Sequence, residues 1–189
     1  LDRYQHRASA PVREVLKSSL DAMAWRGLRD HVDGGFFRYT VDPGWSQPHF
    51  EKMLYDNAQL ASLYLRAGQV LQREDYIEVG LSTLDFMADH MLSDNGAMVA
   101  SLSAIDAQGR EGAYYLFDLE TLQRTLHKDE LEVLRATWSL NGPAPFEEGY
   151  LLVSQLPLNE VANILGRPLA DVHTLLAGAM AKLRTLRRT

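Results

Sequence analysis

The sequence contains no cysteine, and this absence excludes three kinds of site at once. Without thiols the chain has no disulfide framework, no thiolate metal site and no cysteine nucleophile. The absence of disulfides fits a reducing compartment, so we expect the protein to be cytoplasmic. The 6 histidines show neither H-x-x-x-H nor H-E-x-x-H spacing, and the sequence therefore predicts no metal site and no cofactor.

Long apolar runs and an excess of positive charge are missing as well. No apolar run approaches the roughly 20 residues of a membrane-spanning helix, so we expect no membrane association. The 19 basic side chains are outnumbered by 25 acidic ones, which gives a formal net charge of −6. Because a phosphate backbone rewards positive charge, this composition argues against nucleic acid as a partner.

Residues 158–188 carry the one pattern that favours nucleic acid. Gly166 separates two helical patterns, as in a helix-turn-helix. A recognition helix needs polar and basic side chains at its beginning, whereas the second pattern starts with Leu169, Ala170 and Asp171. A plain helix hairpin is therefore the favoured interpretation of this segment.

The sequence does contain the composition of a globular domain, with 46% hydrophobic and 23% charged residues. Apolar residues at helical spacing predict helices over residues 11–26, 50–71, 75–91, 119–126, 129–138, 158–165 and 169–187. Looser alternation around Gly109 predicts a β-hairpin or a pair of extended arms within residues 96–117. The predicted fold class is mainly α, with antiparallel helix hairpins and one β-hairpin insertion.

One long run, 30-DHVDGGFFRYTVDPGWSQPHFEKMLYDNAQL-60, is here called the signature segment. It closely resembles the signature of the YyaL-like proteins, the family that includes the spermatogenesis-associated thioredoxin-domain proteins. A second family stretch fits more loosely at residues 106–117, because Ala104 and Gln108 stand where the family usually has carboxylates and Phe117 replaces its usual tryptophan. The signature match covers Asp30, Gly34, Gly35, Phe36, Arg38, Tyr39, Asp42, Trp45 and residues 48–60.

The resemblance implies a fragment of a larger protein. Family members have a thioredoxin-like domain followed by a six-hairpin (α/α) barrel, which is shared with N-acylglucosamine 2-epimerases and many glycosidases. Residues 1–189 would then form a single region, the N-terminal half of that barrel, so the expected fold is a partial (α/α) barrel. The thioredoxin-like domain and the second half-barrel, both outside this chain, would be its intramolecular partners. Helix faces left uncovered without the second half predict that the fragment either dimerises through them or is only marginally stable.

In such a barrel the signature segment would form the rim of a cavity that binds a small molecule of the sugar or polyol type. Aromatic rings offer apolar faces to a sugar ring, a guanidinium offers a planar fork of donors, and carboxylates accept from hydroxyls. Phe36 and Phe50 are expected in the core instead. The expected substrate-binding residues are Asp30, Arg38, Tyr39, Asp42, Trp45, Tyr55, Asp56 and Asn57.

His49 and Glu51 are the candidate catalytic residues. With a helix predicted from residue 50, the positive end of the helix dipole should keep His49 neutral and suited to act as a general base. Glu51 would orient it or act as an acid/base itself. The alternative is structural, with both side chains satisfying backbone groups at the helix start. His31 is a second candidate base near the same rim.

Three further side chains of the predicted helix are Asn57, Lys52 and Asp56. Asn57 is either a buried polar link between helices or a donor that lines the cavity. Lys52 and Asp56 have the i, i+4 spacing of a surface ion pair.

Two functions from different classes follow from these residues and the resemblance. The first is a carbohydrate-active barrel with epimerase- or isomerase-like acid/base chemistry at its mouth. The second is a non-catalytic scaffold or binding module that serves the thioredoxin-like domain. Conservative changes at His49 separate the two, because a scaffold tolerates them and an acid/base catalyst does not.

Overall fold

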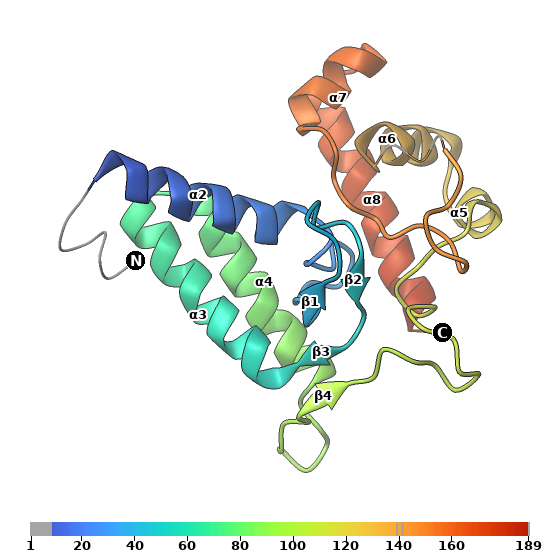
Figure 1. Ribbon diagram of the computed structural model, residues 1–189. Coiled ribbons are helices and arrows are strands. Elements are labelled where there is room, and N and C mark those ends of the chain that lie inside the picture. The colour runs from blue at the N-terminus through green and yellow to red at the C-terminus, as the bar shows by residue number, and fades with distance from the viewer. Residues whose placement is uncertain (1–8, 139, 141, 189) are drawn as a thin grey trace. The chain divides into compact units, whose positions relative to one another are not determined.

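The chain folds into two compact units, the first reaching Ala104 and the second starting at Ile105. The computed structural model describes residues 9–138, 140 and 142–188 (Figure 1). In that part of the chain, seven helices and four two-residue strands are present. The prediction of a mainly helical protein is confirmed, while the arrangement of a half-barrel stays a prediction. None of the described helices combines the length and the apolar character that crossing a bilayer requires.

The first unit is built on an antiparallel hairpin of α3 (Leu54–Leu71) and α4 (Glu74–His90), which lie side by side in Figure 1. Gln72 ends α3 in the left-handed conformation, with φ of 56°. Gly80 allows the two helix backbones to approach closely, because a Cβ atom added there would lie 2.7 Å from Cγ of Leu65. The hairpin forms one wall of the core of this unit.

Helix α2 (Ala10–Trp25) packs on this hairpin through its last two turns. Leu20 and Ala24 are buried in a cluster that includes Tyr64 of α3 and Tyr76 of α4. The Tyr64 hydroxyl donates to the Leu20 carbonyl at 2.7 Å, and the Tyr76 hydroxyl donates to Asp21 at 2.6 Å. These hydrogen bonds replace the water that the two buried hydroxyls lose on folding. They also attach α2 to the α3–α4 hairpin.

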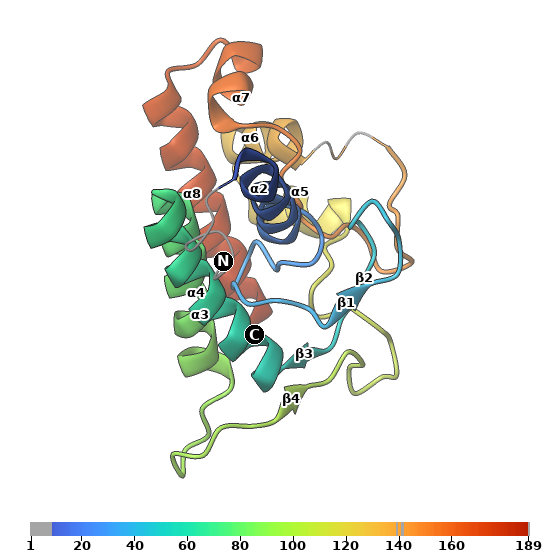
Figure 2. The same ribbon diagram turned by 60° about the vertical axis from the view of Figure 1, so that its left-hand side comes forward.

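Two small antiparallel strand pairs complete the first unit (Figure 2). Strand β1 (Tyr39–Thr40) pairs with β2 (Pro48–His49), with Tyr39 opposite His49. Strand β3 (Lys52–Met53) pairs with β4 (Ser101–Leu102). A small antiparallel hairpin is therefore present, but it lies inside the signature segment.

The prediction of a β-hairpin or a pair of extended arms within residues 96–117 holds at the polar tip, where Ile105 bridges Glu111, but it misses the partner of β4. Alternation of apolar residues indicates an extended chain without identifying its partner, and β4 finds that partner about fifty residues upstream in β3. The polar tip near Gly109 does form a tight turn, in which Asp106 accepts from the backbone N–H groups of Gln108 and Arg110 at 2.9 Å each. A bridge between Ile105 and Glu111 closes that turn.

The pairing of β3 with β4 also moves the start of the second predicted helix. Residues 50–53 are extended, and α3 begins at Leu54 rather than at residue 50. Lys52 points into the interior, where its Nζ donates to Asp30 at 2.9 Å and to the Gly34 carbonyl at 2.8 Å. The predicted surface pair of Lys52 with Asp56 is therefore wrong.

The second unit contains α5 (Leu119–Thr125), α6 (Lys128–Trp138), α7 (Leu158–Leu165) and α8 (Leu169–Arg187). Val133, Val161 and Val172 form the centre of the cluster that joins α6, α7 and α8. Lys182 of α8 donates to the largely buried Glu130 of α6 at 2.6 Å. The predicted bounds of α7 and α8 are confirmed, and the hairpin that they form packs on α6 through apolar side chains.

The ion pair of Lys52 with Asp30 is fully buried, with side-chain exposures of 0% and 1%. The ammonium group also lies 4.1 Å from the centre of the Phe86 ring and 5.0 Å from that of Phe37. Removing one partner of such a pair strands the other charge in a medium that solvates it poorly.

We expect Lys52→Met to lower the free energy of unfolding of the intact protein by about 3–5 kcal/mol, because Asp30 is left buried without its counter-charge. The matched control is Lys17→Met, since Lys17 and Glu14 form an exposed pair at 3.9 Å whose loss should cost under about 1 kcal/mol. Denaturant unfolding measures both values. Equal losses in the two variants would contradict the prediction, and adding Asp30→Leu to Lys52→Met should restore part of the stability.

Candidate functional site

A cleft of about 810 Å³ opens in the first unit, between the end of α2, the segment from Phe37 to Trp45 and the first half of α3. This volume lies in the range of small-molecule sites, which are about 300–1,000 Å³. Its apolar wall consists of Met23, Leu28, Phe37, Leu60 and Leu63. Its polar and aromatic lining consists of Arg38, Tyr39, Thr40, Asp42, Trp45, Asp56 and Gln59.

Helix α3 supplies one wall of the cleft through a single stripe of side chains. Asp56, Gln59, Leu60 and Leu63 follow the spacing i, i+3, i+4 and i+7, which places them on one helix face. A different face, with Asn57, Ala61 and Tyr64, is buried in the core. One helix therefore contributes to the core and to the cleft with separate residues.

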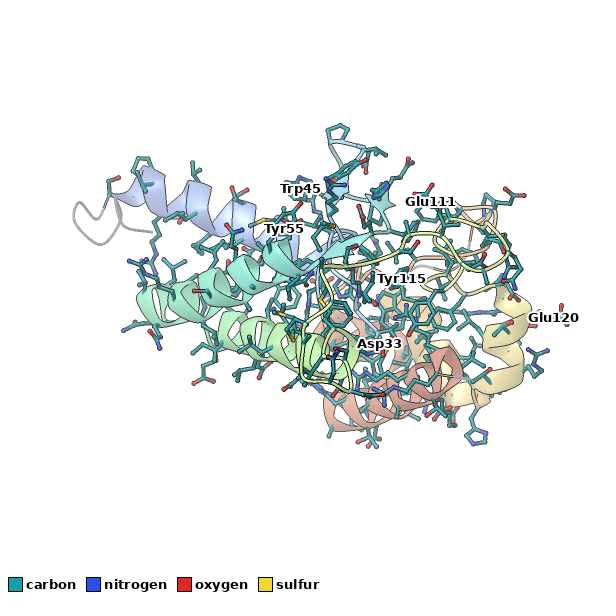
Figure 3. All side chains as sticks on the ribbon, turned by 90° about the horizontal axis from the view of Figure 1, so that it is seen from below. Asp33, Trp45, Tyr55, Glu111, Tyr115 and Glu120 are labelled. Carbon is teal, nitrogen blue, oxygen red and sulfur yellow. The ribbon has the colours of Figure 1, made fainter. Side chains whose placement is uncertain are left out.

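The loop between β1 and β2 forms another part of the cleft lining and is held by Asp42 (Figure 3 labels Trp45 in this loop). The Asp42 carboxylate accepts from the Ser46 N–H at 2.9 Å, the Ser46 hydroxyl at 3.0 Å and the Gln47 N–H at 2.6 Å. Burial alone would raise the pKa of Asp42, but these hydrogen bonds outweigh it and lower that pKa. Trp45 has a backbone φ of 59°, which residues other than glycine rarely adopt. The loop thus holds its tryptophan at the cleft through a fixed backbone.

Arg38 lines the cleft and is held from behind by Glu51. Its Nη1 donates to the Glu51 carboxylate at 2.9 Å, and its backbone N–H donates to the Glu51 carbonyl at 2.8 Å. The hydrogen bond with Glu51 and the neighbouring Tyr55 raise the pKa of Arg38. Glu51 therefore lies outside the cleft lining and outside any helix, and it positions Arg38 through this hydrogen bond.

His49 also lies outside the cleft lining, and it contacts the lining residue Tyr39. Its ring stacks on Tyr39, with centroids 5.0 Å apart and planes within 9°. Its Nδ1 is buried and has no hydrogen-bond partner in the described part of the chain. The expectation of a helix dipole at His49 is wrong, because α3 begins five residues later at Leu54. His49 is thus connected to the cleft through its stacking on Tyr39.

Three of the predicted substrate-binding residues lie outside the cleft lining. Asp30 is buried in its ion pair with Lys52. The Asn57 side chain accepts from the Phe36 N–H at 2.7 Å and donates to the Phe36 and Met53 carbonyls at 3.1 and 2.8 Å. Asn57 is buried as the structural interpretation requires, but it links α3 to the backbone of Phe36 rather than to another helix. The placement of Phe36 in the core is confirmed. Tyr55, which Figure 3 labels, is half exposed in the first turn of α3 and interacts with Arg38.

His31, the second candidate base, is only partly exposed and lies outside the cleft lining. Its Nε2 lies 3.2 Å from the Arg26 carbonyl, to which it donates. Burial and, to a smaller extent, the charge of Arg29 lower the pKa of His31 to about 4. The ring is therefore neutral at pH 7 and serves the connection between α2 and the signature segment.

Gln59 is a cleft residue that the sequence did not single out. A glutamine in a helix is ordinary on any surface, so its type carries no signal. The spacing from Asp56 could have found it, since position i+3 shares the face that Asp56 occupies. Within the described residues, no three histidine, aspartate or glutamate side chains gather as a metal site would require.

The chain is similar to mammalian proteins named spermatogenesis-associated protein 20. It is 38% identical to the human protein over 157 residues, which are 80% of this chain and 19% of the human one. It is 33% identical to the rat protein over 167 residues, 85% of this chain and 20% of the rat one. An uncharacterised protein of Caenorhabditis elegans is 43% identical over 60 residues, 32% of this chain and 8% of that protein.

These proteins are homologues of the chain. The chain spans about a fifth of the length of the curated mammalian relatives it matches. No family model matches the sequence. The similarity agrees with the spermatogenesis-associated part of the resemblance, while the thioredoxin-like domain and the barrel stay predictions.

We expect the free energy of unfolding to fall as the pH drops from about 6.5 to about 4, partly because of His31. Between these pH values His31 binds a proton in the unfolded state but not in the folded state, so a lower pH favours unfolding. His31→Gln keeps a donor for the Arg26 carbonyl and cannot titrate, so its stability should depend less steeply on pH. Denaturant unfolding at several pH values measures the slopes. His173→Gln, at an exposed position of α8, is the control, and equal slopes for wild type and His31→Gln would refute the assignment.

Proposed function

We propose that the cleft binds a small polyhydroxylated molecule of the sugar or polyol type. The observation that carries this proposal is the gathering of Tyr39 and Trp45 with Arg38, Asp56 and Gln59 around one cleft. A sugar ring has an apolar C–H face, which packs on aromatic rings, and an edge of hydroxyls, which need donors and acceptors. The lining supplies both kinds of contact, as small-molecule sites generally do.

The polar residues of the cleft have hydrogen-bonding capacity left for such a ligand. Arg38 carries five N–H donors, and Glu51 and Tyr55 use part of them. The Gln59 amide nitrogen donates to the Tyr55 carbonyl at 3.1 Å, which leaves the amide oxygen as an acceptor. Asp42, by contrast, is occupied by its own loop. Arg38, Asp56 and Gln59 are therefore the polar groups that would orient the ligand.

The reaction that we infer is proton transfer on the bound molecule, of the epimerase or isomerase type, with His49 and Glu51 as the proton-handling pair. The unpartnered Nδ1 of His49 supports a role beyond packing. Both residues lie behind cleft side chains, Tyr39 and Arg38, whose exposures are 46% and 44%. Such exposed side chains can rotate, and the pair would reach the ligand through that movement.

A second candidate function is the non-catalytic scaffold. It is favoured by the buried polar residues of the signature segment, because Asp30, Lys52 and Asn57 bond to each other or to backbone rather than to the cleft. A segment with such a structural role would be needed in a protein with or without catalysis. Activity measurements decide between the two candidates.

We expect neutral sugars to bind the intact protein, and Trp45→Gly to weaken that binding about tenfold, because the stacking face is lost. Glycine accepts the positive φ of this position, so the loop should keep its conformation. Titration calorimetry or ligand-observed NMR measures the affinity. The control is Val41→Ala, which changes an exposed residue of the same loop outside the lining. Equal weakening in both variants would contradict a stacking role for Trp45.

We expect the intact protein in D2O to exchange the C2 proton of a reducing sugar, and His49→Ala to abolish this exchange while neutral sugars still bind. Proton NMR follows the signal. Conservative replacement by His49→Gln should also abolish exchange, since glutamine cannot carry the proton. Folded wild-type protein that binds sugars and exchanges none of their protons would leave the scaffold as the better account.

A further inference from the structure

We infer that Asp56 makes the cleft selective for a cationic ligand, an amine-bearing sugar or polyol, over ligands that carry phosphate or carboxylate. This inference rests on the proposed function of the cleft and adds the charge class of its ligand. Its basis is the state of the three charged side chains that line the cleft, Arg38, Asp42 and Asp56.

Two of these three charges are already compensated within the protein. Arg38 has the Glu51 carboxylate at 2.9 Å. Asp42 has three donors of its own loop, all within 3.0 Å. An anionic ligand could reach the remaining N–H donors of Arg38, but the neighbouring Glu51 charge and the two aspartates would repel it.

Asp56 is the carboxylate of the cleft lining that has no direct partner among the described residues. Within the described residues its carboxylate accepts no hydrogen bond and forms no ion pair. The side chain is partly buried, and burial raises the pKa of Asp56 although the Arg38 charge pulls it the other way. A partly buried carboxylate without a hydrogen-bond donor is energetically unfavourable unless a ligand supplies donors. A ligand ammonium group would supply three donors and the missing positive charge.

The aromatic side chains of the same cleft favour the same class of ligand. The face of a tyrosine or tryptophan ring attracts a cation held within about 6 Å of its centre. One face of Tyr39 is covered by His49, and the residue is 46% exposed on its other sides. Trp45 lines the cleft as well. An ammonium group bound at Asp56 would therefore find both an ion-pair partner and ring faces in one site.

The position of Asp56 on α3 suits this role. It shares the cleft-facing stripe with Gln59, whose amide oxygen is free to accept, and with Leu60 and Leu63. A polyol whose amine bonds to Asp56 can thus extend along the helix, with a hydroxyl at Gln59 and its apolar face toward the leucines. The substrate class that follows is a compact molecule with one amine and several hydroxyls.

The test compares ligands of one size that differ in charge. Glucosamine, glucose, N-acetylglucosamine, glucuronate and glucose 6-phosphate are titrated into the intact protein at slightly acidic pH, where the amine is protonated. We expect glucosamine to bind at least about tenfold tighter than glucose, and the two anions to bind most weakly. The preference should shrink as the salt concentration rises, since salt screens partly exposed charges.

Substitution of the carboxylate tests the residue itself. Asp56→Asn keeps the size of the side chain and removes its charge, so it should weaken glucosamine binding more than glucose binding and reduce the preference for glucosamine to about onefold. Asp85→Asn removes an exposed carboxylate of α4 outside the cleft and should change neither value. Asp56→Ser serves as a second variant if the asparagine variant does not fold.

The outcomes separate this inference from the proposed function. No binding of any of the five molecules by wild type would overturn both. Binding of glucose without a preference for glucosamine, or tightest binding of an anion, would overturn the charge assignment and leave a sugar site in place. A preference for glucosamine that survives in Asp56→Asn and Asp56→Ser would show that another group selects the charge.

Discussion

The buried ion pair between Lys52 and Asp30 is the contact on which the first unit depends. It ties β3 to the turn at Gly34, whose carbonyl also accepts from Lys52. Residues 22 positions apart in the chain are thereby fixed at one point, and the loop, β1 and β2 between them are constrained at both ends. Phe86 of α4 packs on the same ammonium group. The pair therefore connects the signature segment to the helix hairpin as well as to itself.

The signature segment divides its polar residues between two tasks. Asp30, Lys52 and Asn57 turn inward and satisfy one another or the backbone near Phe36. Arg38, Trp45 and Asp56 line the cleft. Similarity to relatives over this segment therefore reflects the needs of the fold together with those of the site, and it does not by itself indicate chemistry.

The helices were predictable where local signals set their ends. Gly166 and the proline after it stop α7 and start α8, and both helices have the predicted bounds. The start of α3 was not predictable in this way. Residues 50–53 read as helix by period, yet the pairing with β4 and the pull of Asp30 on Lys52 hold them extended. Contacts that come from distant parts of the chain override local preference, and a single sequence does not display them.

The candidate site was predictable in its location and less so in its details. An arginine, two aromatics and carboxylates in one long loop indicated a cavity, and Arg38, Tyr39 and Trp45 do line one. Residue type could not tell Asp30, which is buried, from Asp56, which faces the cleft. Their roles are decided by whether a lysine from another strand reaches them. For the same reason, the position of His49 behind Tyr39 follows from strand pairing that its neighbours in sequence do not reveal.

The two-faced construction of α3 has an evolutionary consequence. Substitutions at 56, 59, 60 and 63 change the wall of the cleft, while those at 57, 61 and 64 disturb the core. On the proposed function, selection for folding and selection for ligand choice therefore act on different positions of one helix. On that proposal, related proteins can change the small molecule they bind by substitutions at positions 56, 59, 60 and 63, while the core residues of the same helix stay the same.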